Sequence, residues 1–377
     1  MNAPAVLRPL DDILDRARWA PSGDNRQNCR FEVVADDYVR VHGFDTRHDC
    51  VYDLDGTASQ IALGALVETM AIAASVHGLR IEASRRADAP ENAPQVDVRF
   101  VAAPDVAPDP LADCIETRTV NRRPLSPRPL SAAEREALDA AAGAAHDVVW
   151  REDPRARRRI AALLFRSARL RLTMPEAYLV HRDAIEWGAR FSDDRVPEAA
   201  VGLDPVTARL MRWVMKSWGR VRFFNRFLAG TWTPRLQLDM LPPLMCAGHF
   251  VIVARGGCRG VDDFIAGGRA LQRFWLTAAK LGLQLQPEVT PLIFARYFRE
   301  QRTFSATAGM TRDAGRISAR LDREFGETAA RNAVFMGRVG AGAPAASRSL
   351  RLPIERLMMP TAPVSTTVDQ KLRRTST

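Results

Sequence analysis

One long apolar stretch constrains the fold of this chain more than any other feature. Residues 53–79 read DLDGTASQIALGALVETMAIAASVHGL and predict a helix that ends at Gly78, because glycine commonly terminates helices. Apolar residues surround this helix instead of forming one stripe, so it must be buried on most sides. Its many small residues permit close packing against another helix. Glu68 is the one charge near its middle, and a buried carboxylate is normally paired.

The composition predicts a large core and shows no secretion signal or membrane span. The chain has 377 residues, 46% of them hydrophobic, which suits two or three domains or one duplicated domain. No apolar run reaches eighteen uncharged residues, and the first twelve residues lack the apolar core of a signal peptide. Five scattered cysteines without a CxxC pair fit a reducing compartment. We therefore expect a cytoplasmic protein without a membrane partner.

The charge of the chain favours anionic small molecules over nucleic acids. Its net charge of +10 comes almost entirely from arginine, since Lys216, Lys280 and Lys371 are the only lysines. No zinc finger, RRM-type aromatic motif or clear helix-turn-helix is present, so we expect no nucleic-acid partner. A positive field favours anionic cofactors and substrates. His42 and Cys50 lack further ligands at a characteristic spacing, so we expect no metal.

Periodicity in the remaining chain predicts an α+β protein. The expected helices cover residues 10–20, 131–145, 153–172, 174–191, 207–227 and 261–281. The expected strands cover residues 31–34, 38–41, 80–84, 95–101, 250–254 and 283–287, the first two forming a β-hairpin. The proline-rich stretch 103–110 has no periodicity and reads as a linker between two halves.

Two polar segments are the strongest candidates for a ligand site. In ARWAPSGDNRQNCRF, residues 17–31, a helix breaks at Pro21 and a polar turn precedes a strand. Glycine and asparagine tolerate left-handed backbone, so N–H groups of this turn can point into a pocket. In CIETRTVNRRPL, residues 114–125, three clustered arginines could hold a phosphate. Taken alone, the first segment could also be an ordinary surface turn, and the second could also be a solvated basic turn.

Taken together, these segments resemble the flavin-dependent nitroreductases. Ala20-Pro21-Ser22-x-x-Asn25-x-Gln27 is similar to the APSxxNxQPW segment of that family and departs from it at Asn28-Cys29. RTVNRRPL resembles the RRSxR segment, and is closer still to RRTNRRPF of the duplicated Acg-type branch. In this match Arg118 takes the place of the first arginine, Thr119 the second and Arg122 the last basic residue. Val120 removes one hydroxyl contact.

Two later segments extend the resemblance. GRALQRFWLTAAKLGLQLQPE, residues 268–288, is similar to the family helix that precedes the segment along the flavin ring. FMGRVGAGAPAASRSLRLP, residues 335–353, resembles the final family strand, where a basic-x-Arg pair closes over the FMN phosphate. The resemblance therefore implies a noncovalent FMN site made of Pro21, Ser22, Gly23, Asn25, Gln27, Arg118, Thr119, Arg122, Pro287, Glu288, Val289, Arg348 and Arg351.

The resemblance also implies a nitroreductase-like fold of two fused, unequal halves that form an internal pseudo-dimer, either monomeric or homodimeric. We expect an N-terminal half at 1–110, a C-terminal half at 111–363 with a helical insertion at about 174–241, and a disordered tail at 364–377. One flavin per chain is expected, because the first half lacks its own arginine cluster.

The implied function is that of an FMN-dependent oxidoreductase of nitroreductase type. It would move two electrons as hydride from NAD(P)H, through flavin, to an unknown small-molecule acceptor. No side chain is expected to be catalytic; His181 is either a proton donor or a structural histidine. Two alternatives remain: an FMN storage or sequestering protein whose flavin lies under a lid, and a pathway-specific flavin dehydrogenase.

Overall fold

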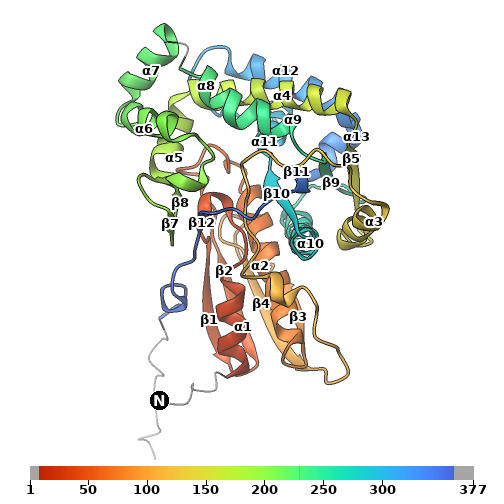
Figure 1. Ribbon diagram of the computed structural model, residues 1–377. Helices are drawn as coiled ribbons and strands as arrows, with labels where there is room; N and C mark the ends of the chain where they lie inside the picture. Colours follow the sequence, from red (N-terminus) through yellow and green to blue (C-terminus); the bar gives the residue numbers. More distant parts are fainter. Residues whose placement is uncertain (1–7, 229, 361–377) are drawn as a thin grey trace, which may run out of the picture.

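The structure is a computed structural model, and it describes residues 8–228 and 230–360 (Figure 1). The fold is α+β, as expected. The tail expected at 364–377 lies outside the described residues. The helices are α1 (Pro9–Ala17), α2 (Thr57–Ser75), α3 (Ala132–Ala141), α4 (Pro154–Thr173), α5 (Pro175–Ala184), α6 (Pro205–Val214), α7 (Trp218–Phe227), α8 (Trp232–Arg235), α9 (Leu241–Leu244), α10 (Val261–Lys280), α11 (Thr290–Arg299), α12 (Met310–Phe325) and α13 (Glu327–Asn332). The strands are β1 (Cys29–Ala35), β2 (Tyr38–Gly43), β3 (Leu79–Arg85), β4 (Gln95–Ala102), β5 (His146–Arg151), β6 (Ile185–Glu186), β7 (Phe191–Ser192), β8 (Val196–Pro197), β9 (Gly248–Ala254), β10 (Leu283–Pro287), β11 (Ala333–Ala341) and β12 (Arg348–Ser349).

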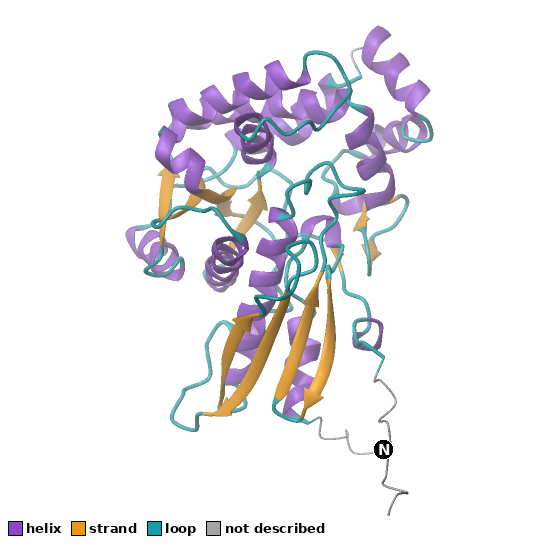
Figure 2. Cartoon of the chain, turned by 180° about the vertical axis from the view of Figure 1, so that it is seen from behind, coloured by secondary structure: helices purple, strands orange, loops and turns teal. Residues whose placement is uncertain are grey.

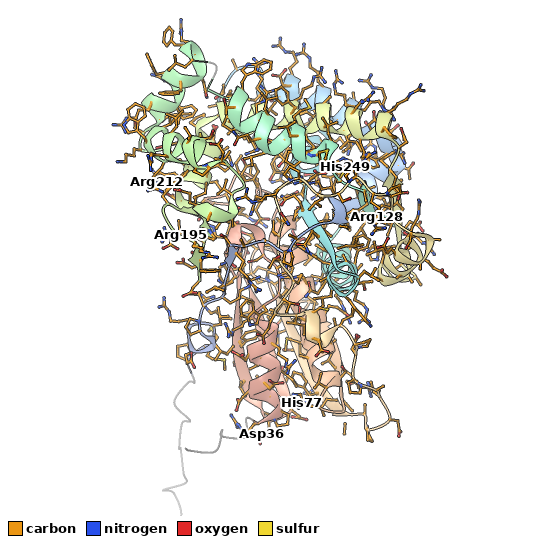
Figure 3. The ribbon with its side chains drawn as sticks, viewed as in Figure 1. Asp36, His77, Arg128, Arg195, Arg212 and His249 are labelled. Atoms are coloured by element: carbon orange, nitrogen blue, oxygen red, sulfur yellow. The ribbon has the colours of Figure 1, made fainter. Side chains whose placement is uncertain are left out.

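The first sheet forms the lower part of the molecule in Figure 1. Its strands are antiparallel in the order β1-β2-β4-β3, and α1 and α2 pack on it. The expected hairpin is confirmed, with its turn at residues 36–37. Asp36 and His77 lie at the far end of this sheet, distant from His249 in the upper part (Figure 3). The inward side chains of Phe31, Val39 and Met70 are completely buried.

The second sheet is antiparallel in the order β5-β9-β11-β10 and is covered on both faces (Figure 2). Every residue of β9 is buried, which explains its apolar run from Phe250 to Ala254. Phe250 and Ile252 face the aromatic core of α10, whereas Val251 and Val253 face the core made by α4, α11 and α12.

The two sheets have the same connectivity. In the first, two strands precede α2 and two follow it, with α1 before them. In the second, β5 and β9 precede α10, β10 and β11 follow it, and α3 comes before them. The order of neighbouring strands is identical, and every pairing within both sheets is antiparallel. The second unit differs by two insertions: a long helical excursion, α4 to α9, between β5 and β9, and helices α11 to α13 between β10 and β11.

The two long helices, α2 and α10, join the two sheets by reciprocal contacts. A Cβ atom added to Gly64 would lie 1.9 Å from the carbonyl oxygen of Ile265, and one added to Gly268 would lie 2.0 Å from that of Ile61. Four residues further along, Glu68 binds Arg273 at 2.9 Å, and Gln272 donates to Thr69 at 2.9 Å. Each contact on one helix thus has a counterpart at the same offset on the other.

Helix α2 has the length and composition of a membrane span, but 72% of its most apolar window is buried inside the structure. It contacts α1, α10 and β3, so its burial confirms the sequence prediction. Glu68 is paired as expected, because Arg269 and Arg273 approach its two oxygens within 2.9 Å.

The last described segment returns to the first sheet. Phe31 donates its amide to the carbonyl of Leu357 at 2.8 Å, and Met359 donates to the carbonyl of Phe31 at 2.7 Å. These bonds place the end of the chain beside β1, on the first sheet's outer edge. A segment that follows the second sheet in sequence therefore extends the first sheet in space.

Several local predictions were wrong. Residues 207–227 form two helices, because Ser217 leaves the helical conformation and caps α7 by accepting from the amide of Arg220 at 3.3 Å. The helix expected at 174–191 ends at Ala184, and short strands follow. The helical excursion also begins earlier than residue 174, at α4. Strand β5 and helices α11 and α12 were not predicted.

The crossing of α2 and α10 predicts a strong dependence on its two glycines. Gly64→Ala or Gly268→Ala should lower the free energy of unfolding by about 3 kcal/mol, because the new methyl group would overlap backbone of the facing helix. Urea denaturation measures this change. Gly256→Ala is the matched control, since no atom lies within 4 Å of its added Cβ. Equal effects at all three positions would contradict close contact at the crossing.

Candidate functional site

A cavity of about 330 Å³ lies where the two sheets meet through α2 and α10; we call it the first cavity. Segments far apart in sequence line it: the polar turn after α1, the segment after the linker, the end of β10, and the segment around β12. Eleven of the thirteen residues predicted for the cofactor site line this cavity. They are Pro21, Ser22, Gly23, Asn25, Arg118, Thr119, Arg122, Pro287, Val289, Arg348 and Arg351.

The polar turn is held in an unusual backbone conformation. Asp24, Asn25 and Gln27 have positive φ angles of 48°, 61° and 51°, whereas Gly23 does not. The sequence analysis expected glycine to supply this freedom, so the expectation was wrong for Gly23. Such conformations cost on the order of 1 kcal/mol each and persist where the surroundings enforce them.

Side-chain hydrogen bonds enforce that conformation. The Ser22 hydroxyl accepts from the amide of Gln27 at 2.9 Å. The Asn25 amide group donates to the carbonyls of Asp193 and Leu350, both at 3.1 Å. Gln27 donates to Asp193 and accepts from the amide of Leu352. Gln27 therefore supports the turn from behind and does not line the first cavity, contrary to its predicted place.

Three arginines converge at one end of the first cavity. Arg118 and Arg351 each donate to the carbonyl of Trp19 at 3.2 Å, and the Arg348 guanidinium lies 4.8 Å from the Trp19 ring centroid. The Arg118 guanidinium also lies 4.4 Å from the ring centroid of Trp275. Arg118 and Arg351 come from segments more than two hundred residues apart, so the fold alone brings them together.

These arginines lack the partners that buried cations normally have. Among the described residues, none of the three forms an ion pair with a carboxylate, and the Nε atom of each is buried without an acceptor. Burial, followed by the charges of Arg351 and Arg348, lowers the pKa of Arg118. Burial also lowers the pKa of Arg351 to about 9. A bound anion would relieve this cost by accepting from several guanidinium groups.

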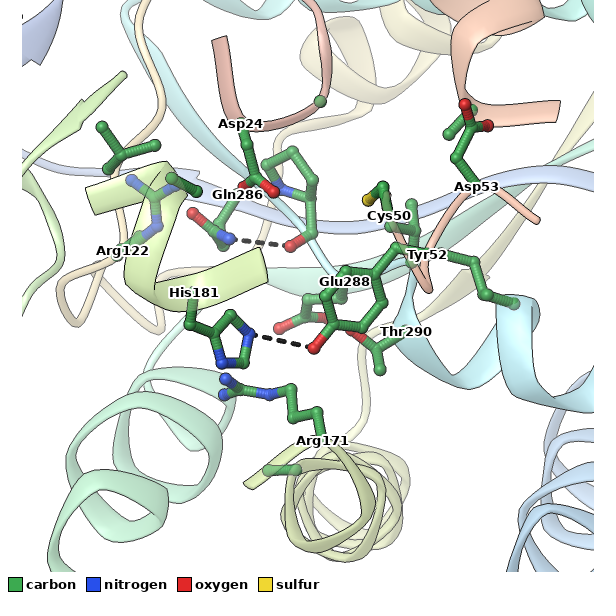
Figure 4. Close-up of a pocket in the computed structure, with 18 of the residues that line it drawn as sticks. Asp24, Cys50, Tyr52, Asp53, Arg122, Arg171, His181, Gln286, Glu288 and Thr290 are labelled. Atoms are coloured by element: carbon green, nitrogen blue, oxygen red, sulfur yellow. Dashed lines mark hydrogen bonds between the residues drawn. The ribbon is translucent and has the colours of Figure 1, made fainter. Parts of the chain in front are cut away.

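A second cavity, also about 330 Å³, adjoins the first and shares part of its lining, including Asp24, Arg122 and Pro287 (Figure 4). The helical excursion closes it with Arg171 and His181. Asp24 thus lies at the junction of the two cavities, and burial raises the pKa of its carboxyl.

Tyr52 and His181 form a neutral hydrogen-bonded pair at the second cavity. The Tyr52 hydroxyl lies 2.9 Å from His181 Nε2. Burial and the charge of Arg171 lower the pKa of His181 to about 3, and burial raises the pKa of Tyr52. Both groups are therefore uncharged near neutral pH. One of their two protons lies in the bond between them, so the pair can donate one further hydrogen bond to a ligand. The sequence analysis left His181 open between a proton donor and a structural residue, and its position keeps both roles possible.

Glu288 has a different position from the one predicted. Its carboxylate lies 2.7 Å from His249 Nδ1 and 2.9 Å from Arg338 Nη1, and all three side chains are buried. His249 Nε2 lies 3.0 Å from the carbonyl of Pro243. Glu288 lines the second cavity and not the first, and it is held in a buried charge network. The network could have been predicted from Arg338, because a charged residue within an otherwise apolar strand needs a buried partner.

Other lining residues escaped the sequence analysis. Asp24 falls at a variable position of the turn motif, and Tyr52 and Arg171 lie in segments that the motifs do not cover. They become neighbours only in the folded chain. No cluster of three or more metal-ligating side chains occurs in the part of the chain that the structure describes.

The structure is an α+β fold with two four-stranded sheets and two adjoining cavities, and three arginines line one end of the first cavity. No model of a known protein family matches the chain. The sequence is 25% identical over 300 residues to the uncharacterized protein MT1398 of Mycobacterium tuberculosis. This alignment covers 78% of the present chain but 41% of that protein, so the chain spans less than half of the relative's length. Functional inference therefore depends on the site itself.

The network around His249 predicts a pH-dependent stability. Burial alone would lower the pKa of His249, but Glu288 and Cys246 outweigh it and raise this pKa to about 10. A group with a raised folded-state pKa stabilises fully below its unfolded value and loses this contribution as pH rises through the folded value. The free energy of unfolding should therefore fall by about 2–3 kcal/mol between pH 7 and pH 10.

Chemical denaturation across this pH range measures the effect. His249→Gln should be less stable at pH 7 and should show a flatter profile, because it lacks the titrating cation. His48→Gln is the control, since His48 is exposed, and it should keep the slope of the parent. A His249→Gln profile parallel to that of the parent would contradict the charged network.

Proposed function

We propose that this protein is an FMN-dependent oxidoreductase of nitroreductase type, transferring hydride from NAD(P)H to a small-molecule acceptor. The observation that carries the proposal is the convergence of buried Arg118 and Arg351 with half-buried Arg348, at the end of a cavity that the polar turn also lines. Among the described residues none of the three arginines forms an ion pair with a carboxylate. The arginines and the turn belong to the segments that resemble the flavin-binding segments of that family.

The first cavity suits both ends of FMN. A phosphate dianion can accept from the three arginines, whose Nε atoms have no partner. Elsewhere in the cavity lining, Asn25 Oδ1 and Gln286 Oε1 are buried acceptors without a donor. Either oxygen could accept a hydrogen bond from the ring N–H of an isoalloxazine. Ile61, Leu271 and other apolar side chains supply a surface for a planar ring. When bound, FMN would supply two-electron redox chemistry.

The chain's own residues would position the reactants. The hydrogen bonds of Ser22 and Asn25 hold the turn in its conformation. Burial of Arg118 and Arg351 keeps water away from the end of the cavity where the phosphate would bind. The second cavity is the place for a donor or an acceptor molecule. There the Tyr52–His181 pair can donate a hydrogen bond to the acceptor, and Arg122 borders both cavities.

The common strand order of the two sheets supports an internally duplicated, nitroreductase-like fold. An internal pseudo-dimer should have equivalent contacts on its two halves, and the reciprocal contacts of Gly64 and Gly268 have this property. The return of the last segment to β1 links the second half to the first. We propose one FMN per chain. Five unpaired cysteines agree with a cytoplasmic location, where thiols stay reduced.

The second candidate is FMN storage or sequestration. The helical excursion covers the second cavity with Arg171, His181 and Leu238, so it could act as a lid over the flavin. A pathway-specific flavin dehydrogenase would catalyse the same hydride transfer with a narrower range of acceptors. Steady-state oxidation of NAD(P)H with a nitroaromatic or quinone acceptor separates turnover from storage.

The cofactor proposal predicts a yellow protein with one FMN per chain. Arg118→Ala and Arg351→Ala should each weaken FMN binding by about tenfold or more, because each removes a charge-assisted bond to phosphate. Absorbance spectra and flavin release after desalting measure this loss. Arg316→Ala, at an exposed arginine on α12, is the control. If both site variants keep full flavin, or the parent takes up none, the proposal fails.

A further inference from the structure

The outer face of the helical excursion is unusually apolar. Of the nineteen exposed large apolar side chains among the described residues, nine lie between residues 205 and 241. This segment is about a tenth of the chain. Helices α6 and α7, at the corner of the molecule farthest from the first sheet, carry five of them, and the segment from Leu228 to Leu241 carries the other four (Figure 1). The nine are Val206, Leu210, Trp213, Phe223, Phe227, Leu228, Trp232, Leu236 and Leu241; we call this surface the α6–α8 face.

The same segment has a one-sided charge. Between Asp204 and Asp239 the sequence contains no carboxylate and seven basic residues. Arg220 and Arg226 lie over exposed aromatic rings, at 4.4 Å from the ring centroid of Trp213 and 5.6 Å from that of Phe227. In Figure 3 Arg212 marks the outer edge of this region. Aromatic and basic side chains on one surface are typical of helices that lie in the interface of an anionic bilayer.

A third cavity, about 130 Å³, lies behind this face and is lined mainly by apolar residues of α5, α6 and α7. Leu210 and Leu228 belong both to its lining and to the exposed α6–α8 face. At its inner end Arg171 and His181 also line the second cavity. The third cavity therefore adjoins both the exposed face, through Leu210 and Leu228, and the second cavity, through Arg171 and His181.

We propose that the α6–α8 face docks on the surface of an anionic lipid bilayer and that the third cavity receives the apolar part of a lipid-soluble acceptor. Glu198 pairs with Arg212, and Arg235 is buried, so the charge that complements anionic headgroups comes from the other five basic residues, Arg209, Lys216, Arg220, Arg222 and Arg226. The exposed aromatic rings suit the headgroup level. A protein partner could cover the α6–α8 face, but it would not account for the apolar third cavity behind that face. The sequence expectation of no membrane partner rested on the absence of a spanning segment, and surface docking needs none.

Sedimentation with vesicles tests docking on the full-length protein, with or without flavin. Vesicles of two parts phosphatidylcholine to one part phosphatidylglycerol should bind the protein at least tenfold better than pure phosphatidylcholine, and high salt should weaken this binding. Phe223→Ser/Phe227→Ser should lose at least tenfold in binding, as should Arg220→Glu/Arg222→Glu. All four side chains project from α7, so the variants should fold, which circular dichroism checks.

The control variant is Arg312→Glu/Arg316→Glu, which makes the same charge change on α12. It should bind like the parent. An equal loss in this control would show that general basicity and not the α6–α8 face binds lipid, and would overturn the proposal. Absence of binding to the anionic vesicles would overturn it as well. So would light scattering that shows a dimer in the parent and a monomer in Phe223→Ser/Phe227→Ser, because a second copy would then occupy the face.

The acceptor half rests on the proposed function and has its own test. Two benzoquinones with the same ring, one with a decyl chain and one without, are compared as acceptors in the presence of anionic vesicles. The quinone gains a hydride and a proton to become a quinol while NAD(P)H becomes NAD(P)⁺. The decyl form should have a kcat/KM at least tenfold higher, and Phe223→Ser/Phe227→Ser should lose this advantage alone. Equal values in the parent would overturn the acceptor half. A protein that binds vesicles but holds no flavin would overturn the oxidoreductase function and with it the acceptor half, and would leave bilayer docking standing.

Discussion

The close crossing of α2 and α10 is the contact on which the remaining structure depends. Each helix offers one glycine, and at each glycine the facing backbone occupies the space of a side chain. This close contact packs the two sheets, each with its own hydrophobic core, against each other through α2 and α10. It also explains why α2 is apolar on nearly all sides: its own sheet, α1 and α10 cover it. The first cavity exists because the two sheets meet along this line and leave a gap at one end of the crossing.

The chemistry of the first cavity follows from an electrostatic imbalance. A buried arginine normally faces a carboxylate, as Arg338 faces Glu288 at 2.9 Å. Arg118 and Arg351 face carbonyl groups and each other's charge instead. Folding of the chain without a ligand must therefore hold like charges together in a site of low solvent access. An anion at that position removes the repulsion, so the same arrangement that costs stability in the free protein gives affinity in the complex.

The sequence motifs pointed to segments that the fold brings together at one cavity, whereas several details of the surrounding fold were not predicted. Short motifs located the turn and the arginine cluster, because their residue types have narrow uses. Glu288 and Gln27 were misplaced because a motif gives position along the chain and not the direction of a side chain. On alternating backbone, Pro287 and Val289 can face the cavity while Glu288 turns toward His249. Asp24, Tyr52 and Arg171 could not be found from spacing, since only the helical excursion brings α4 and α5 over the turn. The break at Ser217 was missed because apolar residues continue through it.

The proposed duplication also explains why one site per chain is expected and not two. In the first unit α1 leads to β1 through the polar turn that lines the first cavity. In the second unit α3 leads to β5 by the corresponding connection, and there residues 142–145 read Ala-Gly-Ala-Ala. This connection has no side chain that can donate or accept a hydrogen bond, whereas the polar turn carries Ser22, Asp24 and Asn25. The arginine cluster and the helical excursion lie on the side of the first turn as well. If the proposed duplication holds, the polar groups have gathered at one of two topologically equivalent positions, and the second unit would serve mainly as structural support through its sheet and its helix crossing.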